Sequence, residues 1–151
     1  MRDAFGPKTE EILRKLKSKD EKAAYAFARE LGEASAKADT YCGLIPAFAS
    51  LLEEKSSYVR TRAFLLICDQ ARWDTEGRIA SVFDRMRPLL CDEKPTVVRQ
   101  CLGALRAVLL FRPELGPVIG DAVRAIDLST YKESMALLIK KDIDALLKIL
   151  S

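Results

Sequence analysis

The chain has 151 residues, enough for one domain to bury a hydrophobic core without a disulfide or a metal ion. Apolar residues make up 49% of the chain and charged residues 31%, a balance unlike that of a disordered or a membrane-embedded protein. The net charge of +3 is too small to indicate a nucleic-acid-binding protein by itself.

Apolar residues recur with a helical period along nearly the whole chain, and no segment alternates for long with the period of two that strands require. The pattern predicts an all-α protein of eight helices. Their connections are short, so neighbouring helices should form antiparallel hairpins. The predicted helices span residues 8–17, 20–37, 43–54, 57–72, 76–90, 95–111, 117–126 and 131–149.

Polar residues that can start a helix stand at several of these boundaries. A capping box needs a hydroxyl at the start of the helix and a glutamate three residues later, so that two free backbone N–H groups are satisfied. The two predicted capping boxes are Ser18 with Glu21 and Thr130 with Glu133. Further helices are predicted to start at Asp74 or Thr75, and at Asp92, which is followed by Pro95.

Two central segments coincide when the sequence is shifted by 39 residues. The segments are LIPAFASLLEEKSSYVRTRAFLL, from Leu44, and FDRMRPLLCDEKPTVVRQCLGAL, from Phe83. Each reads as a helix, an acidic turn and a second helix that opens on Val-Arg, so that Arg60 coincides with Arg99. A period near 40 with two helices per unit is typical of an α-solenoid.

These two units resemble HEAT repeats, whose turn carries Asp and Pro and whose second helix opens on Val-Arg. The second unit has the matching residues Asp92, Pro95, Val98 and Arg99. The first unit has Pro46, Val59 and Arg60, but Glu53 and Ser56 replace the turn Asp and Pro. The resemblance covers residues 43–112. The whole chain also resembles short bacterial HEAT-like proteins of uncharacterised function, through YVRTRAFLLICDQARWD and DEKPTVVRQCLGALRAV.

The resemblance implies an α-α superhelix, a short HEAT-like solenoid of about four antiparallel hairpins that forms a single domain over residues 1–151. The predicted central repeats are 43–72 and 76–111, and the predicted capping hairpins are 8–37 and 117–149. Degenerate end units are expected because a terminal repeat must present one polar outer face.

Arg60 and Arg99 occupy equivalent positions in the two units, and two interpretations follow. They could form a basic inner face, or each could pair with an acid of a neighbouring turn and join successive repeats. A residue that recurs at a repeat junction favours the structural role. Asp92 is the natural candidate for the acidic partner.

The arginine-rich middle of the chain supplies the candidate binding residues. Residues 55–112 hold eleven basic and six acidic side chains, and nine of the eleven are arginines. Arg62 and Arg72 lie off the apolar stripe of their helix, and Arg106 lies on an exposed edge with Arg99. Arginines so placed could grip a carboxylate or phosphate, or could simply form a solvated polar face.

Trp73 is the chain's single tryptophan and lies at a predicted hairpin turn. It could anchor a partner, because tryptophan is enriched in binding hot spots. HEAT-like alkylpurine glycosylases use tryptophan, aspartate and arginine from separate helices around a damaged base, whereas Trp73 and Asp74 are adjacent here. The favoured interpretation is that the Trp73 ring packs between hairpins and Asp74 caps the next helix.

Other classes of site find little support. The chain has no histidine, and its four cysteines form no C-x-x-C pair, so we expect reduced thiols and no metal site. With no Gly-rich phosphate loop either, we predict no catalytic residue, no cofactor and no enzyme. The segment MRDAFGPKTEE lacks the apolar region of a secretory signal, and the uncharged stretch 40–52 is too short to cross a bilayer. We therefore expect a cytoplasmic protein with no membrane partner.

The expected function is a non-enzymatic scaffold or adaptor that binds a protein partner. Binding would use the concave face of the helices at 57–72, 95–111 and 131–149, with Arg62, Arg72, Trp73 and Arg106 as the candidate contacts. One alternative is a nucleic-acid-binding HEAT-like module that uses the arginine-rich middle region. A second is an enzyme or accessory of the HEAT-like glycosylase or lyase type.

Overall fold

The computed structural model describes residues 5–151. The prediction of an all-α protein with eight helices is confirmed for these residues, which include no strand. The helices are α1 (Pro7–Leu16), α2 (Glu21–Ser35), α3 (Ile45–Ala49), α4 (Ser57–Asp69), α5 (Arg78–Met86), α6 (Pro95–Phe111), α7 (Gly116–Arg124) and α8 (Glu133–Leu150). Residues 1–4, which the predicted domain and the segment MRDAFGPKTEE include, lie outside the described residues.

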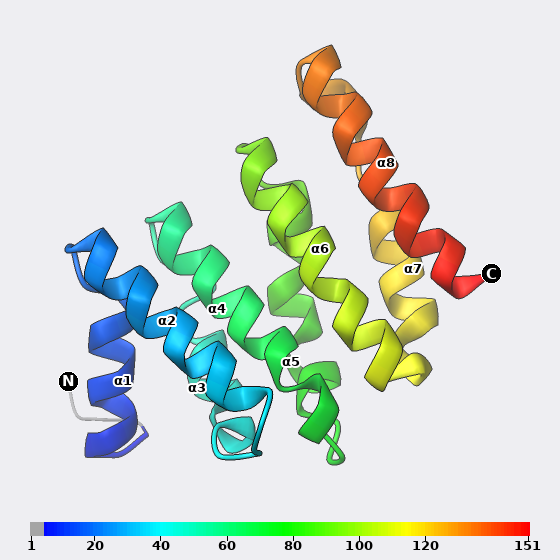
Figure 1. Ribbon diagram of the computed structural model, residues 1–151. Helices are drawn as coiled ribbons and strands as arrows, with labels where there is room; N and C mark the ends of the chain where they lie inside the picture. Colours follow the sequence, from blue (N-terminus) through cyan, green and yellow to red (C-terminus); the bar gives the residue numbers. More distant parts are fainter. Residues whose placement is uncertain (1–4) are drawn as a thin grey trace.

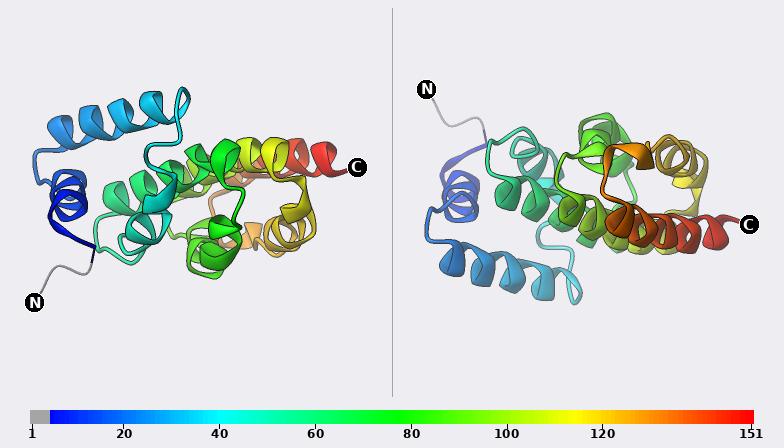
Figure 2. Two further views of the ribbon diagram at one scale, coloured as in Figure 1. Left: turned by 90° about the horizontal axis from the view of Figure 1, so that it is seen from below. Right: turned by 90° about the horizontal axis from the view of Figure 1, so that it is seen from above.

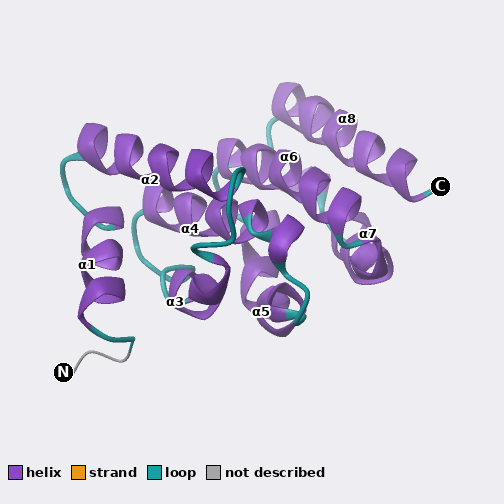
Figure 3. Cartoon of the chain, turned by 60° about the horizontal axis from the view of Figure 1, so that its bottom comes forward, coloured by secondary structure: helices purple, strands orange, loops and turns teal. Residues whose placement is uncertain are grey.

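The helices form two layers, and the chain alternates between them (Figures 1 and 3). Helices α2, α4, α6 and α8 follow one another in one layer, and α1, α3, α5 and α7 lie in the other. The most extensive contacts join α4 to α6 and α6 to α8. Both views of Figure 2 show α2 standing out from the row that α4, α6 and α8 form.

Two predicted helices are shorter than expected, and proline explains one of them. The α-helix α5 ends at Met86, and the chain continues as a 3-10 turn over Arg87–Cys91. Pro88 lacks an N–H group and its ring crowds the carbonyl four residues earlier, so the α-helix cannot continue through it. Helix α3 has only five residues, preceded by a 3-10 turn over Cys42–Leu44.

Both predicted capping boxes are wrong. Asp20 caps α2 and accepts a hydrogen bond from the backbone N–H of Ala23 at 3.1 Å, while Ser18 accepts from the N–H of Asp20 in the preceding turn. Thr130 belongs to the turn before α8 and donates to the Asp127 carbonyl. Each hydroxyl lies two residues before the N-cap position of its helix, and it hydrogen-bonds within the preceding turn instead.

The prediction for Asp74 is confirmed. Its carboxylate accepts hydrogen bonds from the backbone N–H groups of Arg78 and Ile79, each at 2.8 Å, and so caps α5 although it lies four residues before that helix. Gly77, with φ +74°, makes the intervening turn possible because glycine adopts left-handed backbone conformations without steric cost.

A continuous apolar core fills the space between the layers. Phe48 and Phe64 are fully buried in it. Of the four free cysteines, Cys42, Cys68 and Cys101 are buried, and burial raises the pKa of all three thiols. Within residues 5–151, no helix is long and apolar enough to cross a membrane.

Candidate binding groove

An open groove of about 840 Å³ runs between α2, α4 and the first turns of α6. We call it the α2 groove. Side chains of α2, α4 and α6 line it. Figure 2 shows that α2 stands out from the row that α4, α6 and α8 form. The shape of the groove therefore depends on the contacts that hold the first two helices against the rest of the chain.

Arg62 holds one end of the groove. Its guanidinium donates a hydrogen bond to the Leu16 carbonyl at 3.0 Å and pairs with the carboxylate of Glu21. The expectation that Arg62 is a solvent-facing cation for a partner is wrong, because the residue is only 8% exposed. The turn between α1 and α2 covers it, and the Leu16 carbonyl at the end of α1 needs a donor that α1 cannot supply.

A second set of hydrogen bonds holds the other end, where α2 finishes. The Gln70 side-chain amide donates to the Ser35 hydroxyl at 2.9 Å, and the Trp73 indole N–H donates to the Ser35 carbonyl at 2.6 Å. Arg72 donates to the Ala36 carbonyl at 2.9 Å. The bonds from Trp73 and Arg72 satisfy carbonyls at the end of α2 that have no helical partners. Together with Arg62 they fix α2 at both ends.

Trp73 and Arg72 therefore lie beyond the end of the groove rather than in its lining. The Trp73 ring is partly buried and packs against the core. The Arg72 guanidinium is exposed, with its Cζ 4.8 Å from the centre of the Phe111 ring and 5.8 Å from that of the Trp73 ring. Both side chains make contacts that join neighbouring hairpins.

The lining of the groove is largely apolar along its length. Leu65 and Leu66 of α4 and Val97 of α6 contribute to it. Tyr25 of α2 and Tyr58 of α4 also line it, yet they remain 62% and 64% exposed. Exposed tyrosines beside an apolar hollow offer large contact areas and a polar tip, a combination enriched at binding interfaces.

Asp69 is the distinctive charged group of the groove. A Cβ atom built on Gly32 of α2 would lie 3.0 Å from Asp69 Oδ2, so the glycine makes room for this carboxylate at the seam between α2 and α4. Asp69 is exposed to the open groove, yet desolvation by the helices around it raises its pKa to about 6 from an ordinary 3.8. Within residues 5–151, Asp69 has no hydrogen-bond donor or cation close enough to compensate its charge.

The replacement Asp69→Asn should stabilise the protein at neutral pH. The raised pKa means that the folded state holds the Asp69 proton more tightly than the unfolded state, so this group's contribution to stability falls as the pH rises from about 4 to about 6. Thermal unfolding midpoints should be higher for Asp69→Asn than for the wild type above about pH 7 and should converge near pH 4. The control Asp84→Asn, on α5 and outside the groove, should show no such pH-dependent difference.

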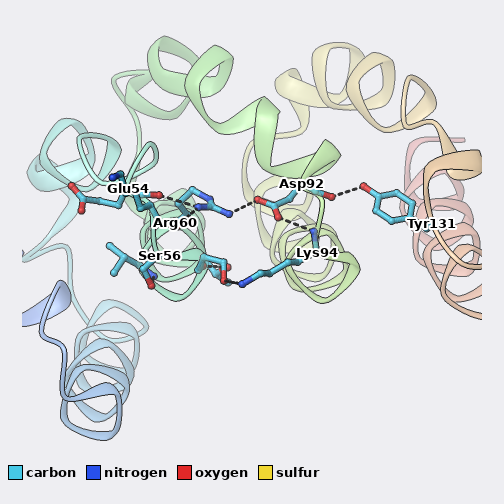
Figure 4. A network of polar contacts seen from close by, with 10 residues as sticks. Glu54, Ser56, Arg60, Asp92, Lys94 and Tyr131 are labelled. Atoms are coloured by element: carbon cyan, nitrogen blue, oxygen red, sulfur yellow. Dashed lines mark hydrogen bonds and ion pairs between the residues drawn. The ribbon is translucent and has the colours of Figure 1, made fainter.

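Two of the residues predicted to join repeats, Arg60 and Asp92, belong to one network of polar contacts (Figure 4). Arg60 Nη2 lies 2.7 Å from Asp92 Oδ2, and Arg60 Nη1 donates to the carbonyls of Glu54 and Lys55. The Tyr131 hydroxyl donates to the Asp92 backbone carbonyl at 2.7 Å. The loop at Asp92 thus contacts the elements before and after it in the row.

Arg99 and Arg106 lie on the side of α6 that faces α8. Arg99 pairs with Asp142 of α8, with Nε 2.7 Å from Oδ2, rather than with an acid in a turn. Arg106 is exposed and borders a depression of about 160 Å³ that Asp142 also lines. Of the four arginine and tryptophan residues predicted to bind a partner, only Arg62 lines the α2 groove, and its charge is already paired.

Sequence reasoning did not identify Tyr25, Tyr58 or Asp69, which line the α2 groove, as candidate site residues. One signal for this region was present, because Gly32 lies within a predicted helix where glycine costs about 1 kcal/mol relative to alanine. Such a glycine often marks a close approach by another group, which here is the Asp69 carboxylate. No three cysteine or acidic side chains in the described part of the chain gather closely enough to hold a metal ion.

Comparisons with protein-family models, with curated proteins and with solved structures found no significant match.

Proposed function

We propose that the protein is a non-enzymatic HEAT-like solenoid that binds a segment of a partner protein in the α2 groove. The observation that carries the proposal is the groove itself, an apolar hollow with Tyr25 and Tyr58 exposed in its lining and with hydrogen-bonded ends. A groove fixed in advance loses little conformational freedom on binding, which favours affinity. The proposed surface includes α2, which the sequence-based concave face did not, and it does not require α8.

The charge of the groove favours a protein partner over nucleic acid. Its lining holds three acidic side chains, Glu21, Glu33 and Asp69, and three basic ones, Lys22, Arg29 and Arg62. Two of the basic groups are paired with acids, Arg62 with Glu21 and Arg29 with Glu33 at 3.5 Å. A phosphate backbone needs a surplus of positive charge along its path, which this lining does not offer.

Binding is also favoured over catalysis. The enzyme alternative requires Trp73 or a perturbed carboxylate in a cleft, and only the carboxylate of Asp69 meets that requirement. Acid–base or nucleophilic catalysis needs a second reactive group within hydrogen-bond reach. Within residues 5–151 no side chain makes a hydrogen bond or ion pair with Asp69. A charge that anchors a ligand fits this arrangement better.

Site-specific photocrosslinking in the cells that produce the protein tests the proposal. p-Benzoylphenylalanine introduced at Tyr58 should give a discrete protein adduct, because this side chain lies in the groove. The control position is Leu137 of α8, which is 60% exposed and lies outside the groove. The adduct should be absent from the Leu137 sample. Identical adducts at both positions, or adducts only at Leu137, would rule out the groove as the binding surface.

A further inference from the structure

The α2 groove has the length of a single helix. Its lining begins with Glu21 at the start of α2 and continues, with residues from every turn, to Ala36 just after the helix. It therefore follows all 15 residues of α2, a length of about 22 Å. A volume of about 840 Å³ over that length gives a cross-section of about 40 Å², at most half that of an α-helix with its side chains. The hollow thus fits one face of a helix and leaves the opposite face in water.

The backbone of the lining offers few hydrogen-bonding groups to a ligand. Except for Ala36, the lining residues belong to α2, α4 or α6, whose N–H and C=O groups between the first and last turns bond within their own helix. Within residues 5–151, Gln100 is the only side-chain amide of the lining, so no row of amides is present to hold an extended backbone. An extended segment would bring unpaired N–H and C=O groups against Leu65 and Val97. A helix avoids that cost because its backbone hydrogen bonds are internal.

The two charged groups of the lining that form no ion pair within residues 5–151 lie at opposite ends of the groove. Lys22 lies on the first turn of α2, and Asp69 lies on the last turn of α4. Helices α2 and α4 run in the same direction (Figure 1), so their partly positive first turns share the end of Lys22 and their partly negative last turns share the end of Asp69. A helix in the groove is attracted most in the opposite direction, with its C-terminal end near Lys22 and its N-terminal end near Asp69.

We infer that the α2 groove binds one amphipathic α-helix of a partner protein, which lies antiparallel to α2 and α4 and directs an apolar stripe towards Leu65, Leu66 and Val97. The inference rests on the proposed function and specifies the ligand of that same groove. The remaining charged groups of the lining form two ion pairs with each other, so the middle of the groove requires no charged residue from the helix. The exposed rings of Tyr25 and Tyr58 add contact area for the same stripe.

Selection from a random peptide library tests the helical form of the ligand and does not require that the natural partner be identified. Peptides of about 18 residues, enough for five helical turns, would be displayed on phage and selected against the wild-type protein. The selected peptides should carry apolar residues at intervals of three and four, the period of one helical face. Tyr58→Glu places a charge in the groove and should weaken their binding at least about tenfold. Leu137→Glu is the matched control, because it adds the same charge at a similarly exposed position outside the groove.

The outcomes separate the inference from the proposed function once thermal unfolding has verified that both variants are folded. Peptides whose apolar residues alternate, or follow no period, overturn the inference, while their weakening by Tyr58→Glu keeps the groove as a peptide site. Failure to select any peptide that Tyr58→Glu weakens contradicts the proposed function as well.

A proline in one selected peptide tests the helix directly. At a central position of the peptide's polar face, proline should weaken binding at least about tenfold relative to alanine, because it removes a helical hydrogen bond and crowds the preceding turn. Equal affinities of the proline and alanine peptides would show that the bound form is not a helix.

The direction of the bound helix is tested with a nitroxide label at either end of the same peptide. A label at the C-terminal end should broaden the amide NMR signals of Lys22 and Tyr58, and a label at the N-terminal end should broaden those of Gly32 and Asp69. The first two residues lie on the first turns of α2 and α4, and Gly32 lies beside Asp69 at the opposite end. The reverse pattern, or broadening of both pairs by either label, would overturn the antiparallel placement.

Discussion

Replacing Asp92 by alanine is expected to lower the free energy of unfolding by about 3 kcal/mol, because it leaves a largely buried arginine without its counter-ion. The Asp92 side chain is 8% exposed and that of Arg60 is 18% exposed, so water can reach neither charge freely. Arg60 would keep its bonds to the carbonyls of Glu54 and Lys55, which hold the guanidinium in place but do not neutralise it. Urea unfolding followed by circular dichroism measures the loss.

The contribution of the Asp92 charge to stability can be separated from that of the hydrogen bond it accepts within its loop. Asp92 also accepts a hydrogen bond from the backbone N–H of Lys94 at 2.9 Å, and Asp92→Asn can retain this bond while it removes the charge. The double variant Arg60→Met with Asp92→Ala should lose less free energy of unfolding than the two single variants lose together, because it leaves no unpaired ion. Strict additivity would mean that the ion pair does not hold this junction together.

Arg99 and Asp142 provide the matched control for this junction. Their contact has a similar geometry, with two N–H groups of Arg99 at 2.7 and 3.3 Å from the carboxylate, but both side chains are more exposed. Solvent screening weakens such a pair, so Asp142→Ala should cost clearly less stability than Asp92→Ala. Equal losses would show that burial does not explain the importance of the Asp92 junction.

The helices were predictable because the spacing of apolar residues follows directly from which side of each helix faces the core. The period of 39 residues likewise placed Arg60 and Arg99 at equivalent positions. The two arginines nevertheless have different partners, because the position 39 residues after Asp92 is Tyr131. Its phenol donates to the Asp92 carbonyl and offers no negative charge, and Arg99 instead reaches Asp142 on α8.

The α2 groove was not predictable from the same pattern. Helical period identifies the buried face of a helix but does not determine how far one hairpin stands from the next. That distance depends on individual contacts, such as the room that Gly32 leaves for Asp69. Arg62 was misjudged for a related reason. A long arginine side chain can bury its stem and still direct its guanidinium to a carbonyl and a carboxylate, so a basic residue near an apolar stripe need not face water.

Replacing Arg62 by methionine is expected to loosen the first hairpin selectively. Methionine can fill much of the buried volume but cannot donate to the Leu16 carbonyl or pair with Glu21. Glu21 is partly exposed and can be rehydrated, so the main penalty comes from the unsatisfied carbonyl and the lost ion pair, about 2 kcal/mol. The contacts at the other end of α2, through Ser35, would remain.

Amide hydrogen exchange distinguishes this local effect from general destabilisation. Protection should fall in α1 and α2 of Arg62→Met while α4, α6 and α8 retain theirs, because the row of helices keeps its own core contacts. Arg106→Met, which alters an exposed arginine, should leave both groups of helices unchanged. A uniform loss of protection would mean that the first hairpin unfolds only with the whole chain. With a local loss, peptide binding in the α2 groove should weaken as well, because Tyr25 and Gly32 would no longer be held opposite α4.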